Sequence, residues 1–153
     1  MTALPSGYRI EQVDASADAV LRNLYEFYLH DMAEWFLFDT TEEGSYQHQT
    51  ETIWQRGDRV YLLYFDKIPV GFALVGSADE YLNRSGVHDM HDFFVARRHR
   101  RLGVGRAFAS HLFNAHPGEW LVRVFQGNRP AIPFWRAAIS RYAGGPLQEE
   151  VRT

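Results

Sequence analysis

The sequence predicts an α/β fold in which a mixed, mostly antiparallel central sheet carries helices on both of its faces. Its 153 residues suffice for one hydrophobic core, so we expect a single domain over residues 1–153. Apolar residues make up 46% and aromatic residues 15% of the chain, which excludes a disordered protein. The order of strand-like and helix-like segments combines hairpins with crossovers, and this order favours a mixed sheet.

The front of the chain contains one strand, one long helix and an acidic segment. Gly7–Val13 has the pattern of a strand. Apolar residues then recur at helical spacing, which predicts an amphipathic helix that is capped by Ser16 or Asp18 and ends near Trp35. Residues 38–49 are irregular and acidic, so we expect a loop there.

The middle of the chain predicts a β-hairpin between a short helix and a polar loop. The short helix is expected at residues 49–56. Arg59–Phe65 and Pro69–Ser77 are apolar, rich in β-branched and aromatic residues and joined through residues 66–67, a pattern that is typical of a hairpin. Ala78–Gly86 is polar and predicts a loop.

The remaining segments alternate strands with helices. We expect strands at Val87–Val95 and Trp120–Phe125, helices at Gly103–Ala115 and from Asn128 to Tyr142, and a short strand within Leu147–Thr153. A strand, a loop and a helix in succession are typical of a crossover unit.

The composition excludes several classes of protein. The chain has no cysteine, which removes disulfides and thiolate metal sites and makes the cytoplasm the expected location. Its apolar runs fall far short of the roughly 18 residues of a membrane span, and its beginning lacks a signal pattern, so we expect no membrane partner. A net charge of −3 and a pI near 6.1 argue against nucleic acid as a partner.

The charges are distributed unevenly along the chain. Residues 1–58 hold eleven acidic side chains against three basic ones, whereas residues 59–153 hold eight acidic and thirteen basic side chains. Such a front half is compatible with a cationic ligand. Five arginines fall within ten residues and create a local field that attracts anions: Arg97, Arg98, Arg100, Arg101 and Arg106.

The most specific feature is a glycine-containing junction between a loop and a helix. Gly103 and Gly105 stand where the helix is expected to begin. The free N–H groups and the dipole of a helix N-terminus bind anions, and glycine lets the backbone approach the ligand closely. Arg100, Arg101 and Arg106 add positive charge, so the segment predicts a phosphate cradle that suits a pyrophosphate.

Spacing separates three motifs that use such a junction. A P-loop requires Lys and then Ser or Thr after its last glycine, whereas Gly105 is followed by Arg106 and Ala107. A dinucleotide-binding fingerprint requires a third glycine where Phe108 stands. The pattern Arg/Gln-x-x-Gly-x-Gly/Ala, by contrast, fits residues 100–105 at every position.

These residues resemble the acetyl-CoA motif of the GNAT superfamily of N-acetyltransferases. Val95 precedes Arg100 by the family's usual five residues, and residues 128–135 resemble its second motif, Asn-x-x-Ala-x-x-Phe-Tyr. Within the superfamily, residues 23–31 and 142–145 are similar to a bacterial branch of predicted acetyltransferases. The resemblance implies a GNAT-like sheet and an acetyltransferase activity.

The resemblance also implies acetyl-CoA as co-substrate. Backbone groups of Phe93 and Val95 would bind the pantetheine arm, the amides from Arg101 to Arg106 would hold the pyrophosphate, and the second motif would line the far wall. The implied cofactor-binding residues are Phe93, Val95, Arg100, Arg101, Leu102, Gly103, Val104, Gly105, Arg106, Asn128 and Phe134.

The implied reaction is direct attack of an amine on the thioester. Asp92 stands where the family often has an acid, so it is the candidate base, and the Val95 N–H is the candidate donor to the oxyanion. Alternatively, Asp92 is a structural carboxylate that fixes a loop or pairs with His91 or an arginine. His88, His91 and Asp92 do not converge easily from one strand, because side chains alternate there, so we expect no metal.

The general acid is not at its usual place. Trp135 occupies the position where the family often has a tyrosine, and an indole cannot give up a proton at neutral pH. Tyr142, Tyr46 or a water molecule are the alternatives. Pro133 also predicts that the helix of the second motif begins near Ala131 or later.

The expected acceptor is a primary amine of a small molecule or a peptide. Tyr28, Asp31 and Glu34 are its candidate binding residues, because the first helix would lie over the acceptor side of such a fold. An alternative function is a non-catalytic acyl-CoA-binding sensor or regulatory module, which the missing tyrosine favours. A homodimer is possible, in which a second subunit would complete the last strands of the sheet.

Overall fold

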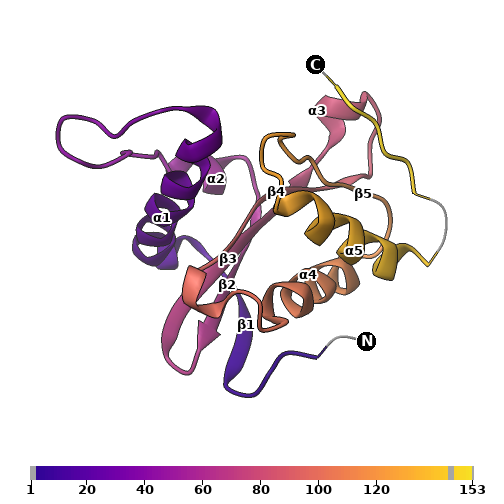
Figure 1. Ribbon diagram of the computed structural model, residues 1–153, viewed down its shortest axis with the longest axis horizontal. Helices are drawn as coiled ribbons and strands as arrows, with labels where there is room; N and C mark the ends of the chain where they lie inside the picture. Colours follow the sequence, from indigo (N-terminus) through magenta and orange to yellow (C-terminus); the bar gives the residue numbers. More distant parts are fainter. Residues whose placement is uncertain (1–2, 145–146, 153) are drawn as a thin grey trace.

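A computed structural model of the chain describes residues 3–144 and 147–152. Five strands form one sheet in the order β1-β2-β3-β4-β5, and the helices lie on its two sides (Figure 1). The strands are β1 (Tyr8–Val13), β2 (Arg59–Phe65), β3 (Ile68–Ser77), β4 (His88–Val95) and β5 (Trp120–Leu121). The helices are α1 (Asp18–Phe36), α2 (Glu51–Gln55), α3 (Asp79–Leu82), α4 (Val104–Ala115) and α5 (Ala131–Ala143), with 3₁₀ turns at Ala15–Ala17 and Arg97–His99.

The sheet is mixed and mostly antiparallel, as the sequence predicts. Strands β1 to β4 each pair antiparallel with their neighbours, and β5 runs parallel to β4. The parallel pair is very short, because only His88 with Trp120 and Asp89 with Leu121 are in register. Beyond Asp89 the edge of β4 therefore has no strand partner on the β5 side within the described residues.

Strand β4 also contains a β-bulge. Met90 pairs with Val75 and Asp92 pairs with Leu74, so His91 is an extra residue between two consecutive positions of β3. A bulge bends the strand and changes the direction of neighbouring side chains. The bulge lies directly after the point where β4 separates from β5.

Each face of the sheet has its own hydrophobic core. On one face Leu21 of α1 and Ile53 of α2 pack with Phe72 and Phe94 of the sheet. On the other face, helices α4 and α5 cover a cluster that includes Phe108, Phe113, Trp135 and Val75. Because side chains alternate along a strand, β4 contributes Phe94 to the first core and Val95 to the second. The prediction of helices on both faces is confirmed (Figure 1).

Three predicted boundaries differ from the structure. The strand expected at Trp120–Phe125 ends at Leu121, because the chain turns away from β4 there. The polar loop Ala78–Gly86 contains the short helix α3, and residues 147–152 form no strand. The last residue of the predicted tail strand, 153, lies outside the described residues.

The start of α5 follows from its prolines. The helix begins at Ala131, as predicted, with Pro130 at the N-cap and Pro133 in the first turn. The N–H groups in the first turn of a helix have no acceptor within the helix. A proline at such a position therefore loses no helical hydrogen bond, so Pro133 is tolerated there. Among the described residues, no helix is both long enough and apolar enough to span a bilayer.

The core on the α4 side sets a test of the fold. Replacing Phe108, which is fully buried, by Ala is expected to lower the free energy of unfolding by about 3–5 kcal/mol, because it leaves a cavity. The control Phe27→Ala lies on the outer face of α1, where the side chain is 62% exposed, and should change it by less than about 0.5 kcal/mol. Urea denaturation measures both, and equal effects would contradict the placement of α4 on the sheet.

Candidate active site

The site begins at the open edge of β4. The N–H of Ala96 donates to the carbonyl oxygen of Val70 at 2.8 Å, which places Ala96 in a hydrogen-bonded pair with β3. In an antiparallel ladder alternate residues turn their N–H and C=O groups to opposite sides. The backbone groups of Val95 and Phe93 therefore point away from β3, toward the edge that β5 leaves open. These are the two residues that the sequence predicts for the pantetheine arm.

The N-terminus of α4 follows this edge. Its first intrahelical bond runs from the Ala107 N–H to the Gly103 oxygen at 3.1 Å, so the N–H groups of residues 104–106 have no acceptor within the helix. Gly103 is the N-cap and has a φ of 79°, a conformation that glycine adopts without strain. A Cβ built there would meet nothing within 4 Å. The junction is therefore an open, positively polarised end of a helix.

The second motif packs against the first. The ring of Phe134 on α5 lies 5.9 Å from that of Phe93, and a Cβ on Gly105 would lie 3.3 Å from it. Asn128 lies in the turn that precedes α5, where its N–H donates to Phe125. Trp135 is only 9% exposed and packs edge-on against Phe93. The structure thus places Phe134 between Phe93 of β4 and Gly105 of α4, and makes Trp135 part of the core.

Two arginines of the segment between β4 and α4 bind the side chain of Asp31 on α1. The Arg100 Nε donates to the carbonyl oxygen of Val95 at 2.6 Å, and its Nη2 donates to Asp31 at 2.6 Å. Arg97 binds the other carboxylate oxygen of Asp31 at 2.8 Å. Arg100 and Asp31, which the sequence predicts for two different ligands, are therefore partners. Their ion pair fastens α1 to the loop after β4.

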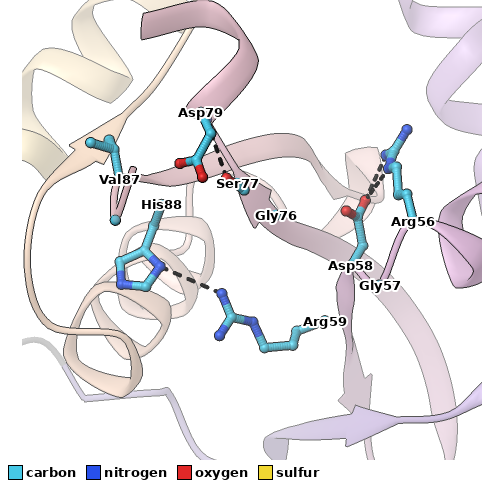
Figure 2. A pocket seen from close by; sticks show the side chains of 10 residues that line it. Arg56, Gly57, Asp58, Arg59, Gly76, Ser77, Asp79, Val87 and His88 are labelled. Carbon is cyan, nitrogen blue, oxygen red and sulfur yellow. Dashed lines mark hydrogen bonds and ion pairs between the residues drawn. The ribbon is translucent and has the colours of Figure 1, made fainter. Parts of the chain in front are cut away.

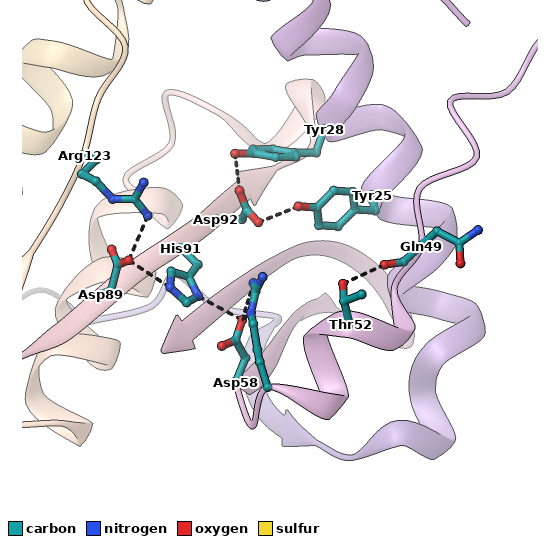
Figure 3. A network of polar contacts seen from close by, with 10 residues as sticks. Tyr25, Tyr28, Gln49, Thr52, Asp58, Asp89, His91, Asp92 and Arg123 are labelled. Carbon is teal, nitrogen blue, oxygen red and sulfur yellow. Dashed lines mark hydrogen bonds and ion pairs between the residues drawn. The ribbon is translucent and has the colours of Figure 1, made fainter. Parts of the chain in front are cut away.

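Asp92 lies beneath α1 and accepts two short hydrogen bonds. The hydroxyl of Tyr28 donates to its Oδ1 and the hydroxyl of Tyr25 to its Oδ2, each at 2.6 Å (Figure 3). Burial raises the pKa of the Asp92 carboxyl, and these bonds offset only part of that effect. Burial and the nearby Asp92 charge raise the pKa of the Tyr28 hydroxyl well above its ordinary value. Among the described residues, Asp92 forms no ion pair with His91 or with an arginine, which was one part of the structural alternative.

Tyr25 is held from the opposite side by a residue that the sequence analysis missed. The ring of His48 stacks on the ring of Tyr25, with centroids 4.0 Å apart and planes within 7°. Tyr25 also stacks on Phe72 in the core. Burial lowers the pKa of His48. No local pattern marks His48, because it lies in an irregular segment and meets Tyr25 only through the fold.

A buried chain of charges crosses the sheet at the bulge. His91 binds Asp58 through Nδ1 at 3.0 Å and Asp89 through Nε2 at 2.9 Å (Figure 3). Arg56 pairs with Asp58 at 2.6 Å, and Arg123 pairs with Asp89 at 2.8 Å. The chain alternates in sign from end to end. It connects the turn before β2, the bulge of β4 and the segment that follows β5.

The two carboxylates keep His91 protonated. Hydrogen bonds to Asp58 and Asp89 raise the pKa of His91 to about 9. Burial alone would raise the pKa of Asp58, but the bonds from His91 and Arg56 outweigh it and lower that pKa. Gly76 makes room for the pair, because a Cβ there would lie 2.6 Å from an Asp58 oxygen. Oδ1 of Asp89 has no hydrogen-bond partner among the described residues.

Two surface pockets flank this region. A pocket of about 400 Å³ opens beside the end of α1 and is lined by residues that include Asp31, Glu34, Asp39 and Tyr46. A second pocket, of about 310 Å³, lies at the other end of the sheet and is lined by residues that include Arg56, Asp58, Arg59, Asp79 and His88 (Figure 2). Asp31 and Glu34 thus share a pocket. Tyr28 does not line it.

The other predicted candidates lie apart from Asp92. His88 contacts Arg59 at 3.4 Å at the far end of β4, so His88, His91 and Asp92 have three different surroundings. Across the part of the chain that the structure describes, no group of three or more acidic or histidine side chains is arranged to hold a metal ion. The Tyr142 hydroxyl bonds the backbone of Gly118, beyond the end of α4.

Known proteins share this architecture. The model of the acetyltransferase (GNAT) family matches residues 29–138. The structure of AAC(6′)-Iy in complex with the bisubstrate analogue CoA-S-monomethyl-acetylneamine has 18% identity and a TM-score of 0.68 over 97% of each chain. The structure of Arabidopsis thaliana NAA60 in complex with acetyl-CoA has 14% identity and a TM-score of 0.58, over 86% of this chain and 85% of that one.

A third similar structure is a tetramutant of the BH1408 protein from Bacillus halodurans, with 13% identity and a TM-score of 0.68 over 95% of this chain and 97% of that one. No curated protein sequence matches the chain significantly. The family match covers well over half of the residues, and the similar structures share the fold. The chain therefore belongs to the acetyltransferase (GNAT) family, and the predictions of a GNAT fold and of an N-acetyltransferase are confirmed.

The protonated His91 predicts a pH-dependent stability. The variant His91→Gln cannot carry the positive charge. The free energy of unfolding of the wild type should therefore exceed that of the variant, and the difference should be largest below about pH 6.5, the ordinary pKa of histidine. That difference should shrink by up to about 1.4 kcal/mol per pH unit as the pH rises toward the folded-state pKa of about 9. Urea denaturation from pH 6 to 10 measures it. A difference that does not vary with pH would contradict a charged His91.

Proposed function

We propose that this protein is an acetyl-CoA-dependent N-acetyltransferase that moves an acetyl group to a primary amine of a small molecule or peptide by direct attack on the thioester. The observation that carries the proposal is the continuity of the open β4 edge with the free N-terminus of α4. An extended arm with amide groups fits such an edge, and a pyrophosphate fits such a helix end. The similar structures named above include complexes with acetyl-CoA and with a CoA-containing analogue.

The residues present fit this co-substrate. The backbone groups of Val95 and Phe93 offer hydrogen bonds to the pantetheine arm, and the amides of residues 101–106 offer them to the pyrophosphate. Gly103 leaves space for an anion, since a Cβ there would meet no atom within 4 Å. Phe134 packs beside Gly105 and closes this end of the groove wall. Acetyl-CoA supplies an activated acyl group with a thiolate as its leaving group.

Asp92 is the proposed base. A general base works best when its pKa approaches the working pH, and burial raises the pKa of Asp92 toward that range. Its two hydrogen bonds hold the carboxylate in one orientation, next to the strand edge where the arm is expected. The neighbouring positive charges of Arg56 and His91 oppose part of this rise in pKa. Asp92 then takes a proton from the acceptor nitrogen.

The acceptor is proposed to be cationic. Arg97 and Arg100 both pair with Asp31, and the pocket is lined by two further carboxyl side chains, Glu34 and Asp39, together with Arg97. An ammonium group is attracted to such a surface before it loses its proton at Asp92. The analogue bound in the similar AAC(6′)-Iy structure is CoA-S-monomethyl-acetylneamine. A preference for anionic or uncharged amines in acceptor screening would overturn this part of the proposal.

The phosphate cradle predicts a loss of CoA binding in Gly103→Asp. The new carboxylate would repel the pyrophosphate, so the micromolar affinity expected of the wild type should fall by at least about tenfold. Gly44→Asp is a matched control, because Gly44 also has a positive φ, of 77°, and open space around it but lies in the acidic segment. Isothermal titration of CoA into all three proteins measures the difference. If the wild type binds no CoA, the proposed function is wrong.

The base predicts a separate effect on turnover. Asp92→Asn preserves the shape of the side chain and removes the proton acceptor, so kcat should fall by about 10²–10⁴-fold while CoA affinity stays within about threefold. A steady-state assay of thiol release with a panel of diamines and peptides measures kcat. CoA binding by a wild type that acetylates no amine would favour a regulatory module instead.

A further inference from the structure

The proposed reaction lacks a proton donor for the leaving sulfur at the family's usual position. Trp135 stands there, and its ring is packed in the core between Phe93 and Phe113. Tyr142 is bonded to the backbone of Gly118, and Tyr46 contacts His30 beside the α1 pocket. None of the polar groups of these three side chains is bonded to Asp92 in the part of the chain that the structure describes. Apart from water, a donor would therefore come from another element.

Tyr28 of α1 lies between the proposed base and the proposed pantetheine site. Its hydroxyl bonds Asp92, and its ring meets the ring of Phe94 farther along β4 at 6.3 Å. One turn later on the same helix, Asp31 binds Arg100, which in turn bonds the carbonyl oxygen of Val95. Helix α1 therefore follows β4 from Asp92 toward Val95, and Tyr28 is the hydroxyl on that path.

The two tyrosines on Asp92 differ in what surrounds them. In Figure 3 the Tyr28 hydroxyl lies on the side of Asp92 that faces Arg123, and the Tyr25 hydroxyl lies on the other side. The charge of Arg123 accordingly acts on Tyr28, whereas Arg56 and Asp58 act on Tyr25. Both tyrosines contact Phe72, but the ring of His48 stacks on Tyr25. Tyr28 faces the open edge of the strand, and Tyr25 faces the α2 side.

We propose that Tyr28 donates the proton that the departing sulfur of CoA receives, in place of the tyrosine that Trp135 replaces. This inference rests on the proposed function. The acceptor nitrogen forms its bond to the acetyl carbon, and the bond from that carbon to sulfur breaks. Asp92 takes one proton from the acceptor. Tyr28 gives its hydroxyl proton to sulfur and receives the proton held by Asp92, so both side chains return to their starting state.

The proton balance closes without another group. An ammonium acceptor loses two protons when it becomes an amide: one reaches sulfur through Asp92 and Tyr28, and the other leaves with water. Burial and the negative charge of Asp92 raise the pKa of the Tyr28 hydroxyl. If Tyr28 acted alone, it would therefore be a poor proton donor. Here the hydroxyl is reprotonated by Asp92 as it donates, so no tyrosinate accumulates. The negative charge of Asp92 opposes ionisation of the Tyr28 hydroxyl, and this charge disappears once Asp92 is protonated.

The matched variants are Tyr28→Phe and Tyr25→Phe, since each removes one 2.6 Å bond from the same carboxylate. On acetyl-CoA, Tyr28→Phe is expected to lose about 10²-fold or more in kcat, the range of general acid catalysis, and Tyr25→Phe less than about tenfold. Thermal denaturation by circular dichroism checks that both variants are folded. Equal losses in the two variants would overturn a special role for Tyr28.

A binding measurement tests contact with sulfur independently of turnover. Isothermal titration compares CoA with desulfo-CoA, which lacks the sulfur atom. The wild type and Tyr25→Phe should prefer CoA by roughly three- to tenfold, the worth of one hydrogen bond, and Tyr28→Phe should bind both equally. A purely structural role of Tyr28 would weaken both ligands together and leave the preference intact.

The outcomes separate the two proposals. Transfer by the wild type with an unchanged sulfur preference in Tyr28→Phe would overturn the role of Tyr28 and leave the acetyltransferase proposal standing. A wild type that binds CoA but acetylates no amine would overturn both. Loss of the sulfur preference in Tyr28→Phe alone, together with the larger loss of kcat, is the result that supports Tyr28 as the proton donor.

Discussion

The separation of β4 from β5 after Asp89 is the constraint on which the rest of the site depends. Only two residue pairs join these strands, and the bulge at His91 follows immediately. A buried strand edge with free N–H and C=O groups is costly unless something pairs with it. In the proposed function, the pantetheine arm would pair with this edge, where the Val95 carbonyl oxygen already accepts from Arg100. The N-terminus of α4 would then hold the pyrophosphate of the same ligand.

Alternation along β4 divides the chemistry between the two faces of the sheet. Asp92 and Phe94 point to α1, whereas Phe93 and Val95 point to α4 and α5. In the proposed mechanism, proton transfer would take place on the α1 face, while the second motif packs on the other face and the backbone edge lies between them. The pair of Asp31 and Arg100 joins the two sides at the end of the strand. A shift of one residue in the register of β4 would exchange these roles.

Local chemistry made part of this site predictable. The motif of Gly103 and its neighbouring arginines spans only six residues, so it could be recognised in the sequence. Pro133 by itself predicted where α5 begins. The contacts that matter most around Asp92 join positions more than sixty residues apart, as between Tyr28 and Asp92, and no periodicity encodes them. The pairing of Asp31 with Arg97 and Arg100 was missed for the same reason. The ion pair of Arg123 with Asp89 likewise joins positions 34 residues apart.

The charge chain through His91 has a consequence for sequence divergence. Its members come from three separate places: the turn before β2, strand β4 at and just before its bulge, and the segment after β5. Removing one partner of a buried ion pair costs about 3–5 kcal/mol, which is much of the stability of a domain this size. Single replacements are therefore selected against, while joint replacements are not. Related chains should keep Asp58, His91 and Asp89 together or exchange them together for an apolar set, so these positions should covary.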